Sequence, residues 1–382
     1  MKITQIHLYN LNDAEQQLAG LSALSPDLIL AFGAPTFFAS SQLADQLKQH
    51  APNAALAGCS TAGEILGSGV YDNSCVITAI NFNNTQTHAV TTELRDMADS
   101  FAAGVRLGAN LAADNLSGVL IFGTGVDING SALVAGLESS LPQGVGISGG
   151  LAADAGAFKR TWTLGPAGSS DKHIVAVGLY GSRIHLSYGS FGGWEPFGPM
   201  RKVTRCDGNI LYELDNTRAL DIYKRYLGDY AKDLPSSGLL FPFAMFNSTH
   251  EKHGIFRTIL GINETEGSLT LAGDIDPNGY LALMHSSTDQ LINGAQTAAQ
   301  TAYGQHQGIK EGDSLALLVS CVGRKLVMGD RTDEEVEVVA ATLGKNTPIA
   351  GYYSNGEIAG SEFHLKCHLH NQTMTITWIH EA

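Results

Sequence analysis

Residues 58–67, GCSTAGEILG, recur in altered form near the other end of the chain as residues 351–360, GYYSNGEIAG. Six positions correspond when the two stretches are aligned, namely Gly58, Thr61, Gly63, Glu64, Ile65 and Gly67 with Gly351, Ser354, Gly356, Glu357, Ile358 and Gly360. Matches between glycines carry little weight in a chain with 44 of them. Both stretches, however, follow a strand, a helix and a second strand in that order. This shared context predicts an internal repeat.

Apolar runs and helical periodicity define three such units. In the first, strands are expected at 28–32, 54–57 and 75–82, with a helix at 41–50. In the second, the strands are expected at 119–122, from Val145 and at 174–180, with a helix at 131–140. In the third, they are expected at 315–319, 348–350 and 373–379, with a helix at 334–344. The middle unit keeps Gly146 and Ser148 but has Leu151 and Ala152 where the others have Gly and Glu, so it has lost the acidic position.

These repeated strand–helix–strand–strand units predict an α+β or α/β fold, with mixed β-sheets flanked by helices. Further long helices are expected from Phe101 and from Leu291, ahead of the second and third units. A block between those units contains Trp194, the basic run RKVTR and a helix in TRALDIYKRYLG. We expect a domain boundary where that helix begins, which gives an N-terminal domain of residues 1–215 and a C-terminal domain of residues 216–382.

The composition fits a globular chain, because 44% of its 382 residues are hydrophobic and 16% are charged. A net charge of −14 disfavours binding to nucleic acid or to an anionic membrane surface. The first residues lack the apolar segment of a signal peptide, and no apolar stretch is long enough to span a membrane. The five cysteines are widely spaced without a CxxC pair, which fits reduced thiols. We therefore expect a cytoplasmic protein with no membrane partner.

The turn at 58–65 is the first candidate ligand site. Gly58 and Gly63 let the backbone turn and expose N–H groups, Ser60 and Thr61 add hydroxyls, and Glu64 adds a carboxylate. At the carboxyl end of a strand, this combination could hold a small zwitterion or another polar ligand. The alternative is a structural turn in which the carboxylate caps neighbouring N–H groups.

The last unit supplies the remaining candidates. The repeat extends the ligand-binding interpretation to Ser354, Gly356 and Glu357. Arg324 follows a strand beside a glycine, and a guanidinium there suits bidentate binding of a carboxylate. Cys321, in the same LVSCVGR stretch, is expected to be a small buried side chain, with a metal-ligating or redox-sensing thiol as the alternative.

Three other motifs are weaker candidates for chemistry. Residues 146–150, GISGG, match the pattern of a serine-nucleophile elbow, but the helix that must follow the serine is absent, so Ser148 is not expected to be a nucleophile. Residues 364–370, HLKCHLH, are expected to form a hairpin with the closing strand, with histidines on the solvent face and metal binding by His368 and His370 as the alternative. The HEKH run at 250–253 is expected to be an exposed loop. No catalytic apparatus is recognisable, so no enzyme activity is expected.

Taken together, GCSTAGEI, FGPMRKVTRCDGNILYELDNTRALDIYKRYLG, LVSCVGR, IAGYYSNGEIAG and HNQT resemble the FIST family, in the expected order and over nearly the whole chain. The resemblance implies a FIST N-terminal region followed by a FIST C-terminal region. It also implies a sensory module of signal transduction that binds small ligands such as amino acids.

A FIST chain of this length is also similar to the NosP group of haem-binding nitric-oxide sensors, which regulate a partner histidine kinase. That similarity implies haem b held by an axial His, Cys or Met, with the axial residue unassigned. A haem-free receptor for a small polar ligand, with its pocket at the turns after Gly58 and Gly351, is the alternative.

Overall fold

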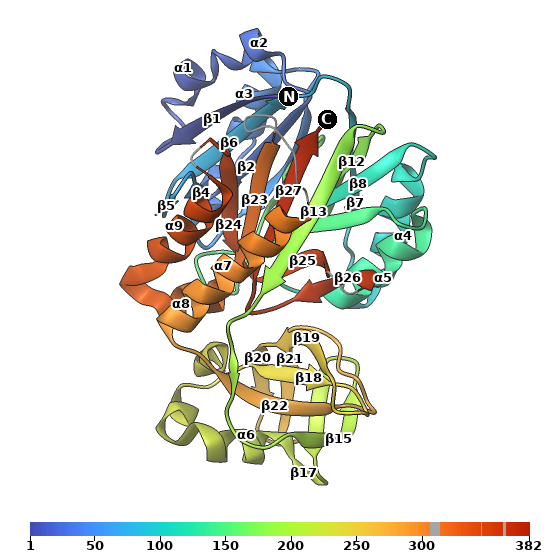
Figure 1. Cartoon of the computed structure of the whole chain (residues 1–382), viewed down its shortest axis with the longest axis vertical. Coiled ribbons are helices and arrows are strands. Elements are labelled where there is room, and N and C mark those ends of the chain that lie inside the picture. Colours follow the sequence, from blue (N-terminus) through green and yellow to red (C-terminus); the bar gives the residue numbers. More distant parts are fainter. Residues whose placement is uncertain (306–313, 345, 362–363) are drawn as a thin grey trace.

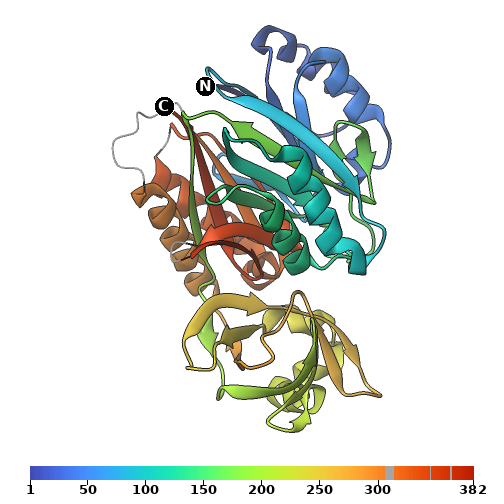
Figure 2. The ribbon, with the colours of Figure 1, turned by 90° about the vertical axis from the view of Figure 1, so that its right-hand side faces the viewer.

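The computed structural model describes residues 1–305, 314–344, 346–361 and 364–382. Three six-stranded sheets surround a shared core and carry their helices on the outside (Figure 1). A smaller β-rich unit of residues 195–285, which we call the insert, stands below them, and the rest is called the body (Figure 2). Both termini lie at the end of the body far from the insert. The predicted α+β class with mixed sheets is confirmed.

The body contains the three predicted units. The first consists of β1 (Lys2–Leu8), α1 (Ala14–Leu18), α2 (Leu21–Leu24), β2 (Leu28–Gly33), η1 (Pro35–Phe37), α3 (Gln42–His50), β3 (Ala55–Ser60), β4 (Glu64–Leu66), β5 (Gly69–Tyr71) and β6 (Cys75–Asn81). The second consists of β7 (Gln86–Glu93), η2 (Met97–Asp99), α4 (Ser100–Leu111), β8 (Leu116–Gly123), α5 (Gly130–Ser140), β9 (Gly146–Leu151), β10 (Thr163–Gly165), β11 (Gly168–Ser170) and β12 (His173–Tyr180). The third consists of β13 (Ile184–Phe191), α7 (Thr288–Gly304), β23 (Ser314–Cys321), α8 (Val322–Met328), η5 (Gly329–Arg331), α9 (Thr332–Leu343), β24 (Ile349–Ser354), β25 (Gly356–Ser361), β26 (His364–His370) and β27 (Met374–Glu381).

The strands pair in the same way in every unit. The two strands on either side of the helix are parallel, as predicted, in the pairs β2–β3, β8–β9 and β23–β24. The closing strands β6, β12 and β27 are antiparallel to the first strand of each pair. Each closing strand is also flanked by an opening strand, β1, β7 or β13, which the sequence patterns did not reveal.

The short hairpins are exchanged around the body in a cycle. The β4–β5 hairpin of the first unit pairs with β24 of the third, and β10–β11 of the second pairs with β3 of the first. The β25–β26 hairpin of the third unit pairs with β9 of the second. Each sheet is therefore completed by a hairpin from another unit.

Alternation along the strands explains how the body is packed. In β2, Leu28, Leu30 and Phe32 point into the core shared by the three sheets, while Ile29 and Ala31 pack under helices α1–α3. Both faces are therefore buried, which is why these strands read as continuous apolar runs. The second sheet is covered in the same way by α4 and α5, and the third by α7 and α9.

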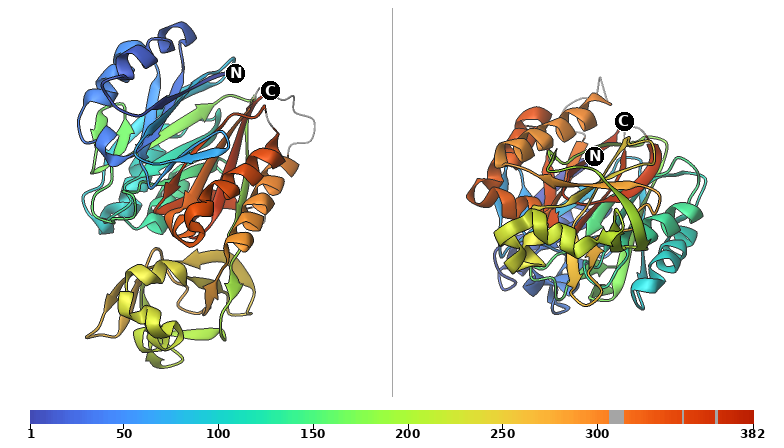
Figure 3. Two further views of the ribbon diagram at one scale, coloured as in Figure 1. Left: turned by 90° about the vertical axis from the view of Figure 1, so that its left-hand side faces the viewer. Right: turned by 90° about the horizontal axis from the view of Figure 1, so that it is seen from below.

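The insert has its own core around Leu220, Tyr223 and Leu269. Its elements are β14 (Glu195–Pro196), β15 (Arg201–Asp207), β16 (Ile210–Leu214), β17 (Thr217–Arg218), α6 (Ala219–Leu227), η3 (Gly228–Asp233), η4 (Ser236–Leu240), β18 (Phe243–Phe246), β19 (Lys252–Arg257), β20 (Ile259–Asn263), β21 (Ser268–Leu271) and β22 (Tyr280–His285). It lies beneath the body in the side view and in front of it when the molecule is seen from below (Figure 3). Residue 215 falls between β16 and β17, inside the insert, and the division of the chain there stays a prediction.

The predicted hairpin between residues 364–370 and the closing strand is wrong. Strand β26 pairs with β25, while β27 pairs with β13 and β23. His370 is buried at 4% exposure rather than placed on a solvent face. The side chains of His253, His364 and Lys366 lie outside the described residues. The physical reason is that the residues between β26 and β27 are themselves buried and carry the chain from one sheet to another.

Candidate functional site

The turn after β3 is organised by the buried carboxylate of Glu64. The hydroxyl of Thr61 donates a hydrogen bond to one carboxylate oxygen over 2.5 Å. The backbone N–H and the hydroxyl of Ser74 donate to the other oxygen, over 3.2 and 2.7 Å. Glu64 is 1% exposed, and its burial raises the pKa of the carboxyl group, although the hydrogen bonds from Ser74 and Thr61 oppose that shift.

The same arrangement recurs in the third unit around Glu357. Ser354 donates to one oxygen over 2.9 Å, and the N–H and hydroxyl of Thr373 donate to the other over 3.1 and 2.8 Å. Burial raises the pKa of Glu357 to about 8. Glu64 and Glu357 each tie the turn to the residue ahead of the closing strand, and the ligand-binding role of both residues stays a prediction.

The middle unit has no carboxylate at this position. Equivalence follows from strand register, that is, from the residue opposite each position on the neighbouring strand. Glu64 lies opposite Tyr352 of β24, and Glu357 lies opposite Gly150 of β9. In the middle unit, Thr163 lies opposite Cys59 of β3 and so occupies the equivalent place. The predicted loss of the acidic group is therefore correct, but the predicted register is not. Gly149, with φ of +139°, overlies the carbonyl of Ile121 as Gly58 overlies that of Ala31. The counterpart of Gly58 is thus Gly149 and not Gly146.

A cleft of about 460 Å³ opens beside the Glu64 turn. Residues 34–35, the turn 61–64 and residues 72–73 line it from the first unit, and α8 lines it from the third. Thr61, Gly63 and Glu64 are thus the predicted residues that reach this cleft, which we call the Lys325 cleft.

Lys325 crosses the mouth of this cleft. Its ammonium donates to the carbonyl of Ala62 over 2.9 Å and forms an ion pair of 2.5 Å with Asp72, whose side chain is 61% exposed. Gly63 has φ of +136°, and a Cβ there would come within 2.5 Å of the Lys325 Nζ atom. Glycine at position 63 therefore makes room for the lysine. Lys325 was missed from the sequence, where its neighbour Arg324 drew attention instead.

Arg324 points away from the cleft and is fully buried. Its guanidinium donates to one oxygen of Glu335 from Nε over 3.1 Å and from Nη2 over 2.6 Å. It also donates to the carbonyls of Gly192 and Leu291. Gly192 lies just ahead of the insert and Leu291 lies in the first turn of α7, just after it, so Arg324 ties the chain on both sides of the insert to α8.

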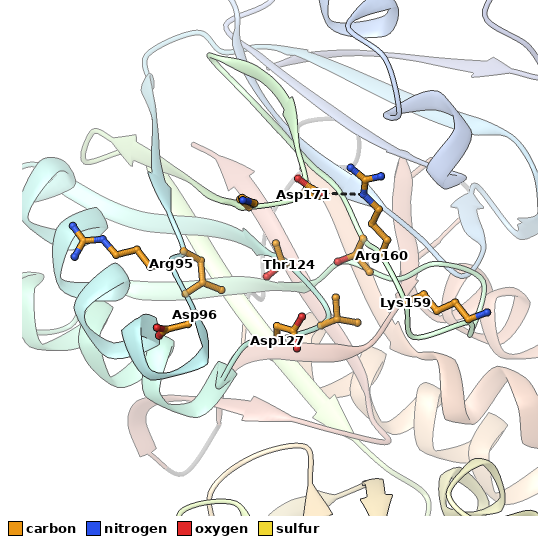
Figure 4. A pocket seen from close by; sticks show the side chains of 11 residues that line it. Arg95, Asp96, Thr124, Asp127, Lys159, Arg160 and Asp171 are labelled. Atoms are coloured by element: carbon orange, nitrogen blue, oxygen red, sulfur yellow. Dashed lines mark hydrogen bonds and ion pairs between the residues drawn. The ribbon is translucent and has the colours of Figure 1, made fainter.

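A second cleft, of about 240 Å³, lies in the second unit at a related position (Figure 4). It is lined by residues that follow β7 and β8, by residues 159–161 ahead of β10, and by residues 171–172 after β11. We call it the Thr124 cleft. It contains none of the predicted ligand-binding residues.

The corresponding place in the third unit is filled by the insert. Gln372 is fully buried, and its amide donates to the carbonyl of Leu239 over 2.9 Å and to the hydroxyl of Thr258 over 3.1 Å. The indole of Trp194 donates to the Gln372 carbonyl over 2.7 Å. Of the three repeat-related positions, two are therefore open clefts and one is occupied by protein.

Comparison with known proteins places the chain in a family. The FIST N domain matches residues 27–217, and the FIST C domain matches residues 219–360. The chain belongs to the FIST family. These domains indicate a sensory protein of signal transduction.

Individual relatives add little to this assignment. An uncharacterised protein of Methanocaldococcus jannaschii is 29% identical over 206 residues, which is 50% of this FIST chain and 38% of that protein. The match thus spans well under half of the relative's own length. A cyanuric acid hydrolase from A. caulinodans aligns over 98% of both chains with 9% identity and a TM-score of 0.34, and a likeness at that level carries no argument.

The remaining candidates of this FIST protein lie in the interior of the sheets. Gly58 and Ser60 are buried in β3, where the Ser60 hydroxyl donates to the carbonyl of Ala153 over 2.7 Å. Ser148 lies within β9, hydrogen-bonded to Thr377, and a long connection to β10 rather than a helix follows that strand. Cys321 is buried as expected, and burial raises the pKa of its thiol.

The described histidines form no metal centre. Across residues 1–305, 314–344, 346–361 and 364–382, no group of three or more His, Cys, Asp or Glu side chains is placed to hold a metal ion. Burial lowers the pKa of His370 to about 4, and its ring lies 3.3 Å from the carbonyl of Ala359. His250 is exposed in the turn before β19. No described helix has the length and apolar character needed to cross a membrane.

Proposed function

We propose that this FIST protein is a sensory receptor for a small zwitterion, such as an amino acid, and that the Lys325 cleft is its ligand site. The observation that carries the proposal is the Lys325–Asp72 ion pair at the mouth of the cleft, with one partner from each of two units. An amino acid presents a carboxylate and an ammonium group close together. Lys325 would bind the carboxylate of the ligand instead of Asp72, and Asp72 would bind the ammonium of the ligand instead of Lys325.

Helix α8 offers a route from this cleft to the insert. Lys325 contacts the ligand site, while Arg324, the next residue, holds the carbonyls of Gly192 and Leu291. The Lys325–Asp72 ion pair joins α8 to the residue that follows the β4–β5 hairpin. A ligand that separates the two side chains would break this contact. We infer that the position of the insert relative to the body is the output of the sensor.

Thermal shift and calorimetry with a panel of amino acids test the proposal. Lys325→Met and Asp72→Asn should each abolish saturable binding of an amino acid that the wild-type protein binds. Lys232→Met is the matched control, because Lys232 forms a similar ion pair of 2.7 Å with Asp229 on the insert. The proposal fails if the panel gives no saturable binding, or if both cleft variants bind as the wild type does.

Haem b, nitric oxide and a partner histidine kinase stay predictions from the resemblance to the NosP group. Axial ligation requires a His, Cys or Met that faces an apolar slot. The Lys325 and Thr124 clefts are lined by none of these residue types among the described residues, so they do not fit haem. Haemin titration followed by absorption spectroscopy tests this prediction, and a saturable Soret band that moves with nitric oxide would support it.

A further inference from the structure

The Thr124 cleft combines basic side chains with a buried hydroxyl group in an otherwise acidic chain. Arg95, Lys159, Arg160 and Lys172 line it, against Asp96, Asp127 and Asp171. Four positive and three negative charges leave this cleft at +1, whereas the whole chain carries −14. An anion is therefore attracted here and repelled by the chain as a whole.

Two of the three carboxylates already have partners. Asp171 accepts a hydrogen bond of 2.8 Å from the Nε atom of Arg160. Asp96 accepts one of 2.9 Å from the backbone N–H of Asp99, where it caps a short helix. These contacts reduce the repulsion that an incoming anion would meet.

The floor of the cleft carries an unpartnered polar atom. Thr124 is 2% exposed, and its hydroxyl oxygen has no hydrogen-bond partner among the described residues. A buried hydroxyl without a partner costs free energy, which a ligand oxygen at that point would recover. Figure 4 shows Thr124 between Asp127 and the Arg160–Asp171 pair, with the side chains of Arg95 and Lys159 extended away from it on opposite sides.

One buried carboxylate fixes the basic wall of this cleft. The N–H groups of Phe158, Lys159 and Arg160 donate to Asp154 over 2.8, 2.7 and 2.9 Å. The backbone is thus held in place while the Lys159 side chain remains exposed and able to turn inward. Arg160 is held instead by Asp171 and lies over the ring of Trp162.

The repeat relationship supports a binding role. The Lys325 and Thr124 clefts are built from corresponding segments of the first and second units. In each cleft one segment follows the first strand of the parallel pair (β2 or β8), a second lies at or just ahead of the exchanged hairpin (β4–β5 or β10–β11), and a third follows that hairpin. The same position in two units therefore carries different side chains. The Lys325 cleft has an ion pair, and the Thr124 cleft has an excess of basic groups.

We propose that the Thr124 cleft is a second ligand site, which binds a small phosphate-type oxyanion. The Thr124 hydroxyl donates to one oxygen, and Lys159 and Lys172 close over the others. Its volume of about 240 Å³ limits the ligand to a small one. This proposal does not depend on amino-acid binding in the Lys325 cleft.

Calorimetric titration of the full chain with inorganic phosphate is the test, with acetate as the second anion. We expect saturable phosphate binding that weakens with added salt, and weaker binding of acetate. Thr124→Val, which removes the hydroxyl and keeps the shape, should lower phosphate affinity about tenfold. The pair Lys159→Gln and Lys172→Gln should lower it by at least as much.

Matched controls make the outcome decisive. Lys202→Gln with Lys232→Gln removes two exposed charges from the insert and should leave phosphate binding unchanged. Lys325→Met should also leave it unchanged, which separates this site from the zwitterion site. The proposal is overturned by the absence of saturable phosphate binding, by acetate binding as tightly as phosphate, or by an equal loss in the control pair.

Discussion

Glu64 and Glu357 occupy the same position in two repeated units, and each carboxylate accepts hydrogen bonds from the same three kinds of donor. A hydroxyl three residues earlier binds one oxygen, and the N–H and hydroxyl of a single residue ahead of the closing strand bind the other. The two networks differ in setting, because Glu64 faces the Lys325 cleft and Glu357 belongs to the position that the insert covers. The two units therefore share the same turn, but an open cleft lies beside one turn and the insert covers the other.

The first prediction concerns pH. The pKa of Glu357 lies at about 8 in the folded chain, against an ordinary 4.5. Between these two values the folded state keeps a proton on Glu357 that the unfolded state has lost, so the contribution of Glu357 to stability should fall as the pH rises. His370, whose pKa is lowered from 6.5 to about 4, acts in the opposite direction up to about pH 6.5, so we expect the net fall above that pH. The slope should approach about 1.4 kcal/mol per pH unit. Urea unfolding at a series of pH values should show a flatter dependence for Glu357→Gln, and an unchanged slope would contradict the assignment.

The second prediction concerns the buried ion pair. Arg324→Met leaves Glu335 buried without its cation and should destabilise the chain by about 3–5 kcal/mol. Arg331→Met breaks the exposed pairs with Glu334 and Asp289 in the same region and should destabilise the chain far less, because solvent screens both pairs. Urea unfolding of the two variants compares them directly, and similar losses would argue against a structural role for Arg324.

The third prediction concerns the close backbone contact at Gly58. A Cβ at this residue would lie 1.9 Å from the carbonyl oxygen of Ala31, and backbone cannot move aside as a side chain can. Gly58→Ala should therefore cost ~3 kcal/mol or more. Gly67 also has positive φ but has open space around it, so Gly67→Ala should cost only ~1 kcal/mol. Equal melting temperatures for the two variants would contradict the idea that the Ala31 carbonyl requires glycine at position 58.

The fourth prediction addresses the wall of the Thr124 cleft. Asp154→Ala removes the acceptor for three backbone N–H groups, so the amides of residues 158–160 should exchange with solvent faster. Asp171→Ala breaks only the contact with the Arg160 side chain and should leave these amides protected. Hydrogen exchange read by NMR or mass spectrometry distinguishes the two, and unchanged protection in Asp154→Ala would be the contrary result.

The order of the central strands and helices could be predicted because the first strand of each parallel pair is buried on both faces. The runs at 28–32, 119–122 and 315–319 stand out for that reason and lie within β2, β8 and β23. The pairing of the hairpins could not be predicted in the same way. Residues 364–378 read as one local hairpin, and nothing in their alternation says that β26 and β27 belong to different sheets.

The candidate site was only partly predictable. The Glu64 turn was found because glycines, hydroxyls and a carboxylate occur together there. Lys325 was missed because the sequence indicated only that Arg324 follows a strand. Residues 322–328 in fact form α8, and neighbouring helical residues point in different directions. The basic residues at 159–160 and 172 gave a signal that could have been used, since they gather near glycine-rich turns in a chain of net charge −14.

The exchange of hairpins has a consequence for how the chain is made. The β4–β5 hairpin is synthesised early, but its partner β24 begins at Ile349. At a translation rate of about 5–20 residues per second, β4 waits on the order of 15 to 60 seconds for the strand that it pairs with. Until then the nascent first unit exposes an unpaired edge, as β3 does while it awaits β10. The cyclic exchange of hairpins is therefore completed only after the third unit has left the ribosome.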